Sequence, residues 1–217
     1  MDLMGGVVVH AAGGDRRGYK PVQSPWLSSP DPVHFVRAMG EKFGFGFFYI
    51  ADLDAIMGKS PNHAAIQKLL QETSANFWLD AGFKTMDNAP AEGRITRIIA
   101  TETFADWDRP GDLSGAVVSV DMNRGRILCS RAGATLEWIM AAARGAGARR
   151  FIHMQLDAVG AGRFNRYKLL PPKEGEQWWA GGGVRDQEDI RSAQEAGYAG
   201  ALVATALHEG GFGPGQG

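Results

Sequence analysis

Two aspartates open the same short motif at two places in the chain, Asp2 in "DLMGGVVVHA" and Asp121 in "DMNRGRILCS". In both copies a glycine follows, and then a run of residues that suits a strand. One such aspartate alone would be expected only to cap its turn. Two carboxylates on opposite sides of a substrate can act as general base and general acid when their environments hold their pKa values apart. Because the motif is repeated, we interpret Asp2 and Asp121 as a catalytic pair.

A run of three glycines forms the second chemical motif, in "AGGGVRDQEDI" at residues 180–190. Glycine lets the backbone come close to an anion, and the start of a following helix presents free N–H groups. The next predicted strand ends in "VATALHEG", where another short helix begins. These two neighbouring turns predict a phosphate site, which we assign to Gly182, Gly183, Ala204 and Thr205.

Apolar and β-branched runs alternate with helical patterns along the chain, which predicts repeated strand–helix units and a parallel sheet. The runs predict strands at 7–10, 46–52, 75–80, 95–100, 115–121, 149–156, 176–180 and 199–204. The segments between them predict helices near 31–43, 61–72, 85–91, 133–146, 163–170, 185–196 and 205–209. Asp2 and Asp121 are then assigned to the ends of the first and fifth strands.

Four motifs of the first half recur in the same order in the second half, each at the end of a predicted strand. The two aspartate motifs are 119 positions apart, "LDAIMG" matches "LDAVGAG" at an offset of 103, "LDAGFKTMDNA" matches "AGGGVRDQEDI" at 101, and "IIATETF" matches "LVATALH" at 104. Four matches in register predict a (β/α)8 TIM barrel built from two half-barrel repeats. In such a barrel the first and fifth strands face each other across the mouth.

The offset falls from 119 at the first match to 103 at the second, so the first half carries about 16 extra residues between these two motifs. They lie in the polar segment "AGGDRRGYKPVQSPWLSSPDP". Long loops in compact domains are usually either functional or disordered. At the carboxyl face of a barrel we favour a lid over the active site, with a solvated insertion as the alternative. The residues expected to reach the ligand are Arg16, Arg17 and Trp26.

In the first half, Asp80 and Ala81 stand where the second half has Gly181 and Gly182. A carboxylate beside a phosphate is repulsive, although Lys84 one helical turn later could neutralise it. We therefore predict a second pocket for a polar, cationic or neutral group; the alternative is that Asp80 caps the helix at 85–91. The pocket is assigned to Asp80, Gly82, Lys84, Ala100 and Thr101, and Asp52, Asp54 and Asp157 are expected to contact the substrate or brace the rim.

The composition is that of an ordinary globular protein, with 217 residues of which 44% are hydrophobic and 22% charged. A formal net charge of −1 predicts no nucleic-acid or membrane partner, and no apolar run reaches the roughly 20 residues of a membrane span. The single cysteine, Cys129, and the lack of a signal-like start favour the cytoplasm. Five scattered histidines predict no metal site, and no cofactor is expected. We expect one barrel over 1–209 and a disordered glycine-rich tail over 210–217.

The motifs "DLMGGVVVHAAGGDRRGYKP", "YIADLDAIMG", "SVDMNRG", "GGGVRDQEDI" and "LVATALHEG" resemble those of the histidine-biosynthesis barrel family, HisA and HisF, an isomerase and its sister cyclase. The likeness covers almost the whole chain. In "ADLDAI", "LDAG", "ATET" and "LDAVGAG" the chain is more similar to a divergent branch of that family. This branch occurs in archaea and in methylotrophs that use methanopterin as a one-carbon carrier.

The resemblance implies a metal-free barrel in which Asp2 is the base and Asp121 the acid of an Amadori-type rearrangement. Three departures from the family pattern speak against the bisphosphate substrate of the histidine pathway. The departures are Asp80-Ala81-Gly82 in place of a glycine-rich motif, Leu156-Asp157 in place of Thr-Asp, and Ala100-Thr101 in place of Gly-Thr.

Only Met1 precedes Asp2, so we expect a truncated first strand that holds its aspartate poorly.

Three functions remain open from the sequence. The paired aspartates and the phosphate turns favour an isomerase of a sugar phosphate of the phosphoribosyl-amine type. The same carboxylates would also serve a lyase or cyclase step in pterin-type cofactor biosynthesis. The truncated first strand favours a non-catalytic phosphosugar-binding protein. In each case the expected partner is a phosphorylated small molecule, and the oligomeric state stays open.

Overall fold

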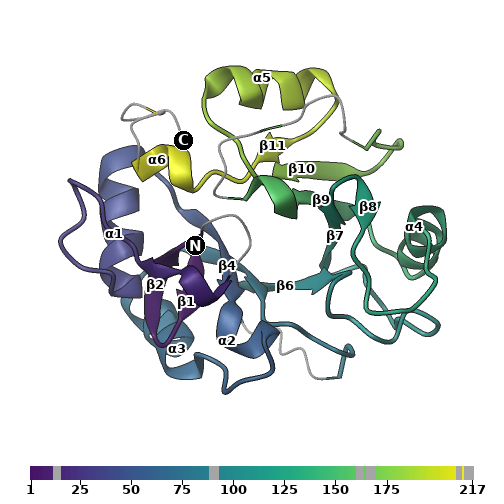
Figure 1. The fold of residues 1–217 in the computed structure, drawn as a ribbon, viewed down its shortest axis with the longest axis horizontal. Helices are drawn as coiled ribbons and strands as arrows, with labels where there is room; N and C mark the ends of the chain where they lie inside the picture. Colours follow the sequence, from purple (N-terminus) through teal and green to yellow (C-terminus); the bar gives the residue numbers. More distant parts are fainter. Residues whose placement is uncertain (12–15, 88–92, 160–163, 165–169, 209–211, 213–217) are drawn as a thin grey trace.

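The computed structural model describes all residues except 12–15, 88–92, 160–163, 165–169, 209–211 and 213–217. Its strands curve round a common centre, and the longer helices lie outside them (Figure 1). Three short strands, β2 (Val7–His10), β3 (Lys20–Pro21) and β8 (Arg126–Ile127), pair antiparallel at the rim. The parallel strands follow one another in chain order as β1 (Asp2–Met4), β4 (Phe47–Asp52), β5 (Asn76–Asp80), β6 (Ile95–Ala100), β7 (Val117–Asn123), β9 (Arg150–Gln155), β10 (Gln177–Gly181) and β11 (Gly200–Ala201).

This order of parallel strands is that of a (β/α)8 barrel, as the sequence predicts. β1 and β11 are the two ends of the parallel series, and no hydrogen bond joins them in the described part of the chain. β1 has three residues, whereas its counterpart β7 has seven, so the first strand is short as expected. The helices are α1 (Pro32–Phe43), α2 (Leu53–Ile56), α3 (His63–Glu72), α4 (Leu136–Gly145), α5 (Gln187–Glu195) and α6 (Thr205–His208), with single turns η1 (Arg16–Gly18) and η2 (Leu156–Ala158).

The two halves of the barrel have the same strand register. In the first half the paired residues are Asp2 with Ala51, Ala51 with Asp80, and Leu79 with Arg97. In the second half they are Asp121 with Met154, Met154 with Gly181, and Ala180 with Ala201. Equivalent residues differ by 119, 103, 101 and 104 positions, which are the offsets of the sequence motifs. The half-barrel repeat is therefore a property of the backbone.

The repeated aspartate motif is a β-hairpin in both halves. Leu3 pairs with Val8 in the first copy, and Met122 pairs with Ile127 in the second, each shifted by 119 positions. The prediction that 7–10 is the first parallel strand is wrong. The segment is the antiparallel arm β2, and its longer apolar run masked the three-residue strand before it.

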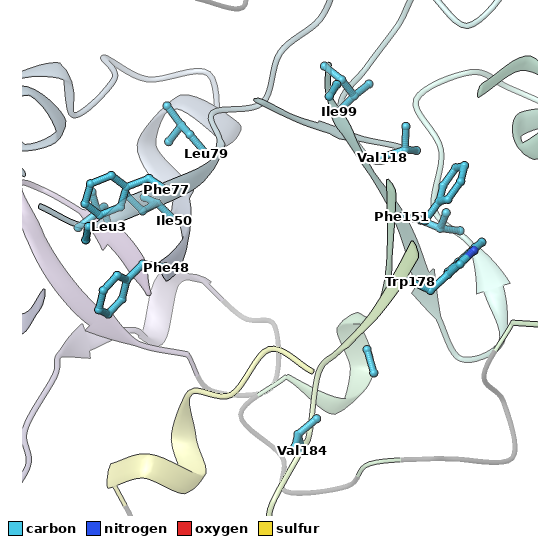
Figure 2. Packing of buried hydrophobic residues seen from close by; sticks show 14 of the residues in the cluster. Leu3, Phe48, Ile50, Phe77, Leu79, Ile99, Val118, Phe151, Trp178 and Val184 are labelled. Carbon is cyan, nitrogen blue, oxygen red and sulfur yellow. The ribbon is translucent and has the colours of Figure 1, made fainter. Parts of the chain in front are cut away.

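Alternation along the strands separates two apolar layers. One layer lies inside the barrel, where Trp78 of β5 meets Trp179 of β10 edge to face at 4.6 Å, among Ile98, Val117 and Ile152. The other layer lies between the strands and the helices. Figure 2 shows its side chains pointing outward from the ring of strands, including Leu3, Phe48, Ile50, Phe77, Leu79, Ile99, Val118, Phe151 and Trp178.

Local signals account for the helix ends. Asp31 caps α1 by accepting from the backbone N–H groups of Val33 and His34, and Gly44 ends the helix in the left-handed conformation. The helix predicted at 85–91 is absent over 85–87, and the rest of that range lies outside the described residues. Most of the helix predicted at 163–170 also lies outside them, as does the tail at 210–217 apart from Phe212, which is buried.

Candidate active site

Three aspartates point into the barrel: Asp2 is the first residue of β1, Asp80 is the last residue of β5, and Asp121 lies in the second half of β7. Asp2 and Asp80 both share a register row with Ala51, so their side chains leave the same face of the sheet. Asp80 follows Trp78 by two residues, and Asp121 follows Val117 by four, and both of those residues belong to the interior layer. The inward face therefore presents carboxyl groups from β1, β5 and β7.

Asp121 is the most enclosed of the three, with 4% of its surface exposed. Its carboxyl oxygens accept hydrogen bonds from the Ser119 hydroxyl at 2.7 Å, the Glu102 backbone N–H at 2.9 Å and the Thr101 hydroxyl at 3.3 Å. The pKa of Asp121 is raised to about 7, first by burial and then by the charges of Asp80 and Glu102, against the opposing effect of the hydrogen bonds. A carboxyl group with this pKa holds a proton for part of the time at neutral pH.

Asp80 is bound by the Gly82 backbone N–H at 3.0 Å and by the Tyr49 hydroxyl at 3.4 Å. Burial raises the pKa of Asp80 to about 6, and the nearby Glu102 adds to the effect. The pKa of Tyr49 is raised well above its usual value, first by burial and then by the charges of Asp80, Asp121 and Asp2. The phenol therefore stays a hydrogen-bond donor among the three carboxyl groups.

Asp2 lies in a strand that is anchored on one side. The Met1 ammonium group donates to the Tyr49 carbonyl at 2.5 Å, and the Met1 carbonyl accepts from the Ala51 N–H at 3.0 Å. Burial raises the pKa of Asp2, whereas the Met1 ammonium, Arg16 and His10 favour its charged form. These backbone bonds hold Asp2 in register with β4 even though β1 is short.

Arg16 is the lid residue that the structure brings to the carboxyl groups. Its guanidinium donates to the Glu102 carboxylate at 2.9 Å, and each of these side chains is 25% exposed. The charge of Arg16 also acts on Asp80 and Asp2. The sequence assigned this neutralising role to Lys84. Lys84 is exposed in a bend, and no ion pair with Asp80 is found among the described residues.

The other predicted lid residues have different surroundings. Trp26 stacks on His208 of α6 at 5.3 Å and meets Phe43 of α1 edge to face at 5.6 Å. This packing ties the segment after η1 to the end of the barrel. The side chain of Arg17 lies outside the described part of the structure.

The rim carboxylates brace the backbone. Asp52 is fully buried; it caps α2 through the Ala55 N–H and accepts from the backbone and side chain of Asn62. Asp54 accepts from the Gly5 N–H at 2.6 Å and thereby holds the turn of the first hairpin. Asp157 is exposed in η2. Asp52 and Asp54 thus fulfil the bracing alternative that the sequence left open.

The predicted phosphate turns lie beside a cavity of about 520 Å³. Gly182 has φ 92°, and a Cβ there would overlap the carbonyl of Gln155, so the turn requires glycine. Gly183, Ala204 and Thr205 also line the cavity, together with Asp2. The first N–H groups of α5 are not free as predicted, because the Asp186 side chain caps Glu188 and Asp189. Any anion at this site is therefore left with the glycine turn and the start of α6.

The corresponding turn of the first half differs from the glycine turn chiefly in having Asp80 where the second half has Gly181. By strand register Asp80 is equivalent to Gly181, and Ala100 is equivalent to Ala204. Gly82 keeps a positive φ of 62°, and a Cβ there would lie 2.8 Å from the Ile56 Cα. Thr101 turns toward Asp121 instead of a free pocket, because its hydroxyl accepts from the Asp121 N–H.

Two residues of the site were missed in the sequence, Tyr49 and Glu102. Tyr49 lies two positions before Ala51 and therefore shares its inward face, a signal that alternation from Ala51 would have supplied. Glu102 lies in "ATETF", but its contacts come from η1 and β7. No local pattern predicts contacts between segments so far apart.

The order of the parallel strands around one centre defines a (β/α)8 barrel, with inward carboxyl groups and glycine turns at its mouth. A family profile described as "Histidine biosynthesis protein" matches residues 1–213, and the chain belongs to this family.

Three relatives span nearly all of the chain. An uncharacterized protein of Methanocaldococcus jannaschii is 28% identical over 218 residues, covering 97% of this chain and 92% of its own. A protein of Halobacterium salinarum named 1-(5-phosphoribosyl)-5-(5-phosphoribosylamino)methylideneamino imidazole-4-carboxamide isomerase is 27% identical over 228 residues, with 98% and 91% covered. A protein of the same name from Cenarchaeum symbiosum is 28% identical over 225 residues, with 97% and 93% covered.

No helix in the described part of the chain is long and apolar enough to cross a membrane. Within the same residues, no three His, Cys, Asp or Glu side chains are grouped as a metal site would require.

Proposed function

We propose that the protein is an isomerase of a phosphorylated ribosyl-amine or a similar sugar phosphate, with Asp2 as general base and Asp121 as general acid. The observation that carries the proposal is the set of inward carboxyl groups that β1, β5 and β7 contribute, with Asp2 and Asp80 in one register row and Asp121 from β7. Relatives named as isomerases of a phosphoribosyl compound support the reaction class.

The raised pKa of Asp121 supports its part as the acid. The pKa of Asp121 is raised to about 7 by burial, so its carboxyl group can donate a proton at neutral pH. In an aldose-to-ketose rearrangement that proton goes to the ring oxygen, and the ring C–O bond breaks to leave an open-chain imine. Asp2, beside the Met1 ammonium and Arg16, then takes the proton from C2. The resulting enamine tautomerises to the ketose.

The two turns support a substrate with one phosphate group. The glycine turn at Gly182 and Gly183, with Ala204 and Thr205, suits an anion. The equivalent first-half position carries Asp80, whose carboxylate repels one. We infer that the far end of the substrate is neutral, cationic or a hydrogen-bond donor, which argues against a bisphosphate.

A screen of sugar phosphates and phosphoribosyl-amines by thermal shift, followed by product analysis of every stabilising compound, tests the function. The proposal expects at least one compound to raise the Tm and to be converted to an isomer of equal mass. A product of lower mass, formed by elimination or ring closure, would support a lyase or cyclase instead. Stabilisation without conversion of any compound would support a binding protein and contradict the proposal.

A further inference from the structure

The cavity beside the glycine turn has a polar part and an apolar part. Its volume of about 520 Å³ lies within the roughly 300–1,000 Å³ that is usual for small-molecule sites. Asp2 and the turns at Gly182, Gly183 and Thr205 line the polar part. Residues of β4, β5, β10 and β11 line the apolar part. A phosphate group bound at the turns would therefore occupy only the first of the two parts.

The apolar part lies at the seam between β1 and β11. β1 pairs with only the last two residues of β4, and Phe47 and Tyr49, which come earlier in that strand, line the cavity. The equivalent seam of the repeat is the one between β6 and β7. It is closed, because residues 98–100 pair with residues 117–119. The cavity is thus a feature of one seam and not of the repeated scaffold.

Aromatic side chains form much of the wall of the apolar part. Phe47 meets Trp78 edge to face at 4.8 Å, and Trp78 meets Trp179 in the same way at 4.6 Å. Tyr49 stands two positions after Phe47 on the same face of β4, and its hydroxyl donates to Asp80. All four rings line the cavity, where a further ring would meet them in the stacked or edge-to-face geometry that aromatic groups prefer.

The strands that line the apolar part contribute no charged side chain to it. Arg185, near the glycine turn, lines the cavity but donates to Asp189 at 2.8 Å. The Met1 ammonium donates to the Tyr49 carbonyl at 2.5 Å. Burial lowers the pKa of His208 to about 4, so its ring is uncharged at neutral pH. A charged ligand group would lose its hydration in the apolar part without gaining a partner, whereas an uncharged ring would gain contacts.

We propose that the apolar part of the cavity binds a flat, uncharged aromatic group of the phosphorylated substrate. The inference rests on the proposed function for the phosphate at the glycine turn, and it adds the chemistry of the rest of the molecule. Gly182 and Thr205 line the same cavity as Trp78 and Trp179, so one ligand spans both parts. Burial of the aromatic group then adds binding free energy to that of the phosphate.

Calorimetry with two neutral probes tests the aromatic wall without any phosphate. Naphthol and decahydronaphthol share one carbon skeleton, and only naphthol is flat and aromatic. Naphthol is expected to bind about three- to tenfold more tightly, because it alone can stack on the rings of the wall. Equal affinities would overturn the proposal.

Naphthyl phosphate tests whether the two parts form one site. It is expected to bind about tenfold more tightly than either naphthol or inorganic phosphate, because its two ends are linked. A naphthyl phosphate that binds no better than naphthol would contradict a shared site. Failure of the proposed isomerase function would appear as absent conversion in the product analysis, which leaves these binding measurements untouched.

Two variants assign the binding to the cavity. Phe47→Ala removes one ring of the wall and is expected to weaken naphthol binding about threefold. Leu202→Trp fills the cavity from the end of β11 and is expected to abolish naphthol binding. Leu128, like Phe47, is a large apolar residue with an exposed side chain, and it does not line the cavity. Leu128→Ala and Leu128→Trp are therefore the matched controls and are expected to bind naphthol as the wild type does.

Far-UV circular dichroism checks that each variant is folded. Phe47→Ala changes an exposed side chain and keeps the test decisive if Leu202→Trp does not fold. Naphthol binding that is unchanged in the folded variants of Phe47 and Leu202 would overturn the proposal.

Discussion

The two halves of the barrel share one backbone and differ in the groups they place at its mouth. The first half ends β5 with Asp80 and follows β6 with Glu102, whereas the second half has Gly181 and Ala206 at these positions. Hairpins, strand registers and interior tryptophans match between them. A repeated scaffold thus acquires an asymmetric site through a few side chains near the strand ends.

The largest expected effect comes from the pair of residues that the halves share. Asp121→Asn keeps the size of the side chain but cannot donate the acid proton, so turnover of the substrate found by the screen should fall about 10²- to 10⁴-fold. The turnover of Asp2→Asn should fall by a similar factor because the base is lost. Steady-state kinetics checks this, with Asp108→Asn, which breaks the exposed Asp108–Arg131 pair, as the control. Near-normal turnover in Asp121→Asn would show that Asp121 is not the general acid.

The glycine turn of the second half should be sensitive to any side chain. Gly182→Ala forces a Cβ against the Gln155 carbonyl at a positive φ and is expected to cost about 3 kcal/mol of unfolding free energy. Gly5→Ala, at a positive φ with open space around it, carries the conformational strain alone, about 1 kcal/mol. Urea denaturation measures both. Equal losses would show that the close approach at Gly182 is unimportant.

The first-half carboxylate should reduce stability at high pH. Because the pKa of Asp80 is raised by burial to about 6, its contribution to folding is fully present below about pH 4 and is lost as the pH rises through 6. Asp80→Asn is therefore expected to be more stable than wild type by about 1–3 kcal/mol at pH 8. At pH 4 the two proteins should unfold alike. A gain of equal size at both pH values would contradict the charge explanation.

The same carboxylate should set the number of anions that the mouth accepts. Asp80→Gly copies the second half and removes the repulsion, so a second phosphate should bind about tenfold more tightly than to wild type. Calorimetry with inorganic phosphate measures the change, and Asp108→Gly, at an exposed aspartate paired with Arg131, serves as the control. An unchanged second site would mean that Asp80 does not exclude anions.

Much of the barrel could be predicted because its strands are buried on both faces and read as continuous apolar runs. The strand at 95–100 was predicted with its observed ends, and the four motif offsets reappear in the strand registers. The first strand was misassigned because three residues carry too little pattern beside the apolar arm of the hairpin. The prediction of a helix at 85–91 is wrong over 85–87, where the chain forms bends and a turn despite its helical sequence pattern.

The inward placement of the proposed site residues follows from the sequence where a repeated motif marks them. Asp2, Asp80 and Asp121 share the inward parity that alternation implies, and their catalytic or binding roles stay a prediction. The partner of Asp80 was not predictable: proximity in sequence suggested Lys84, whereas the cation near it is Arg16, far away in the chain. The expected helix start at α5 is capped by its own Asp186, a local bond that competes with an outside anion.

The central claim is that one half of the barrel holds the phosphate and the other half repels it. Titration of ¹⁵N-labelled protein with inorganic phosphate, combined with calorimetric stoichiometry, tests this most directly. We expect one phosphate per chain, with amide shifts concentrated at Gly182, Gly183 and Thr205. Two phosphates of similar affinity, or shifts centred on Gly82 and Thr101, would contradict it.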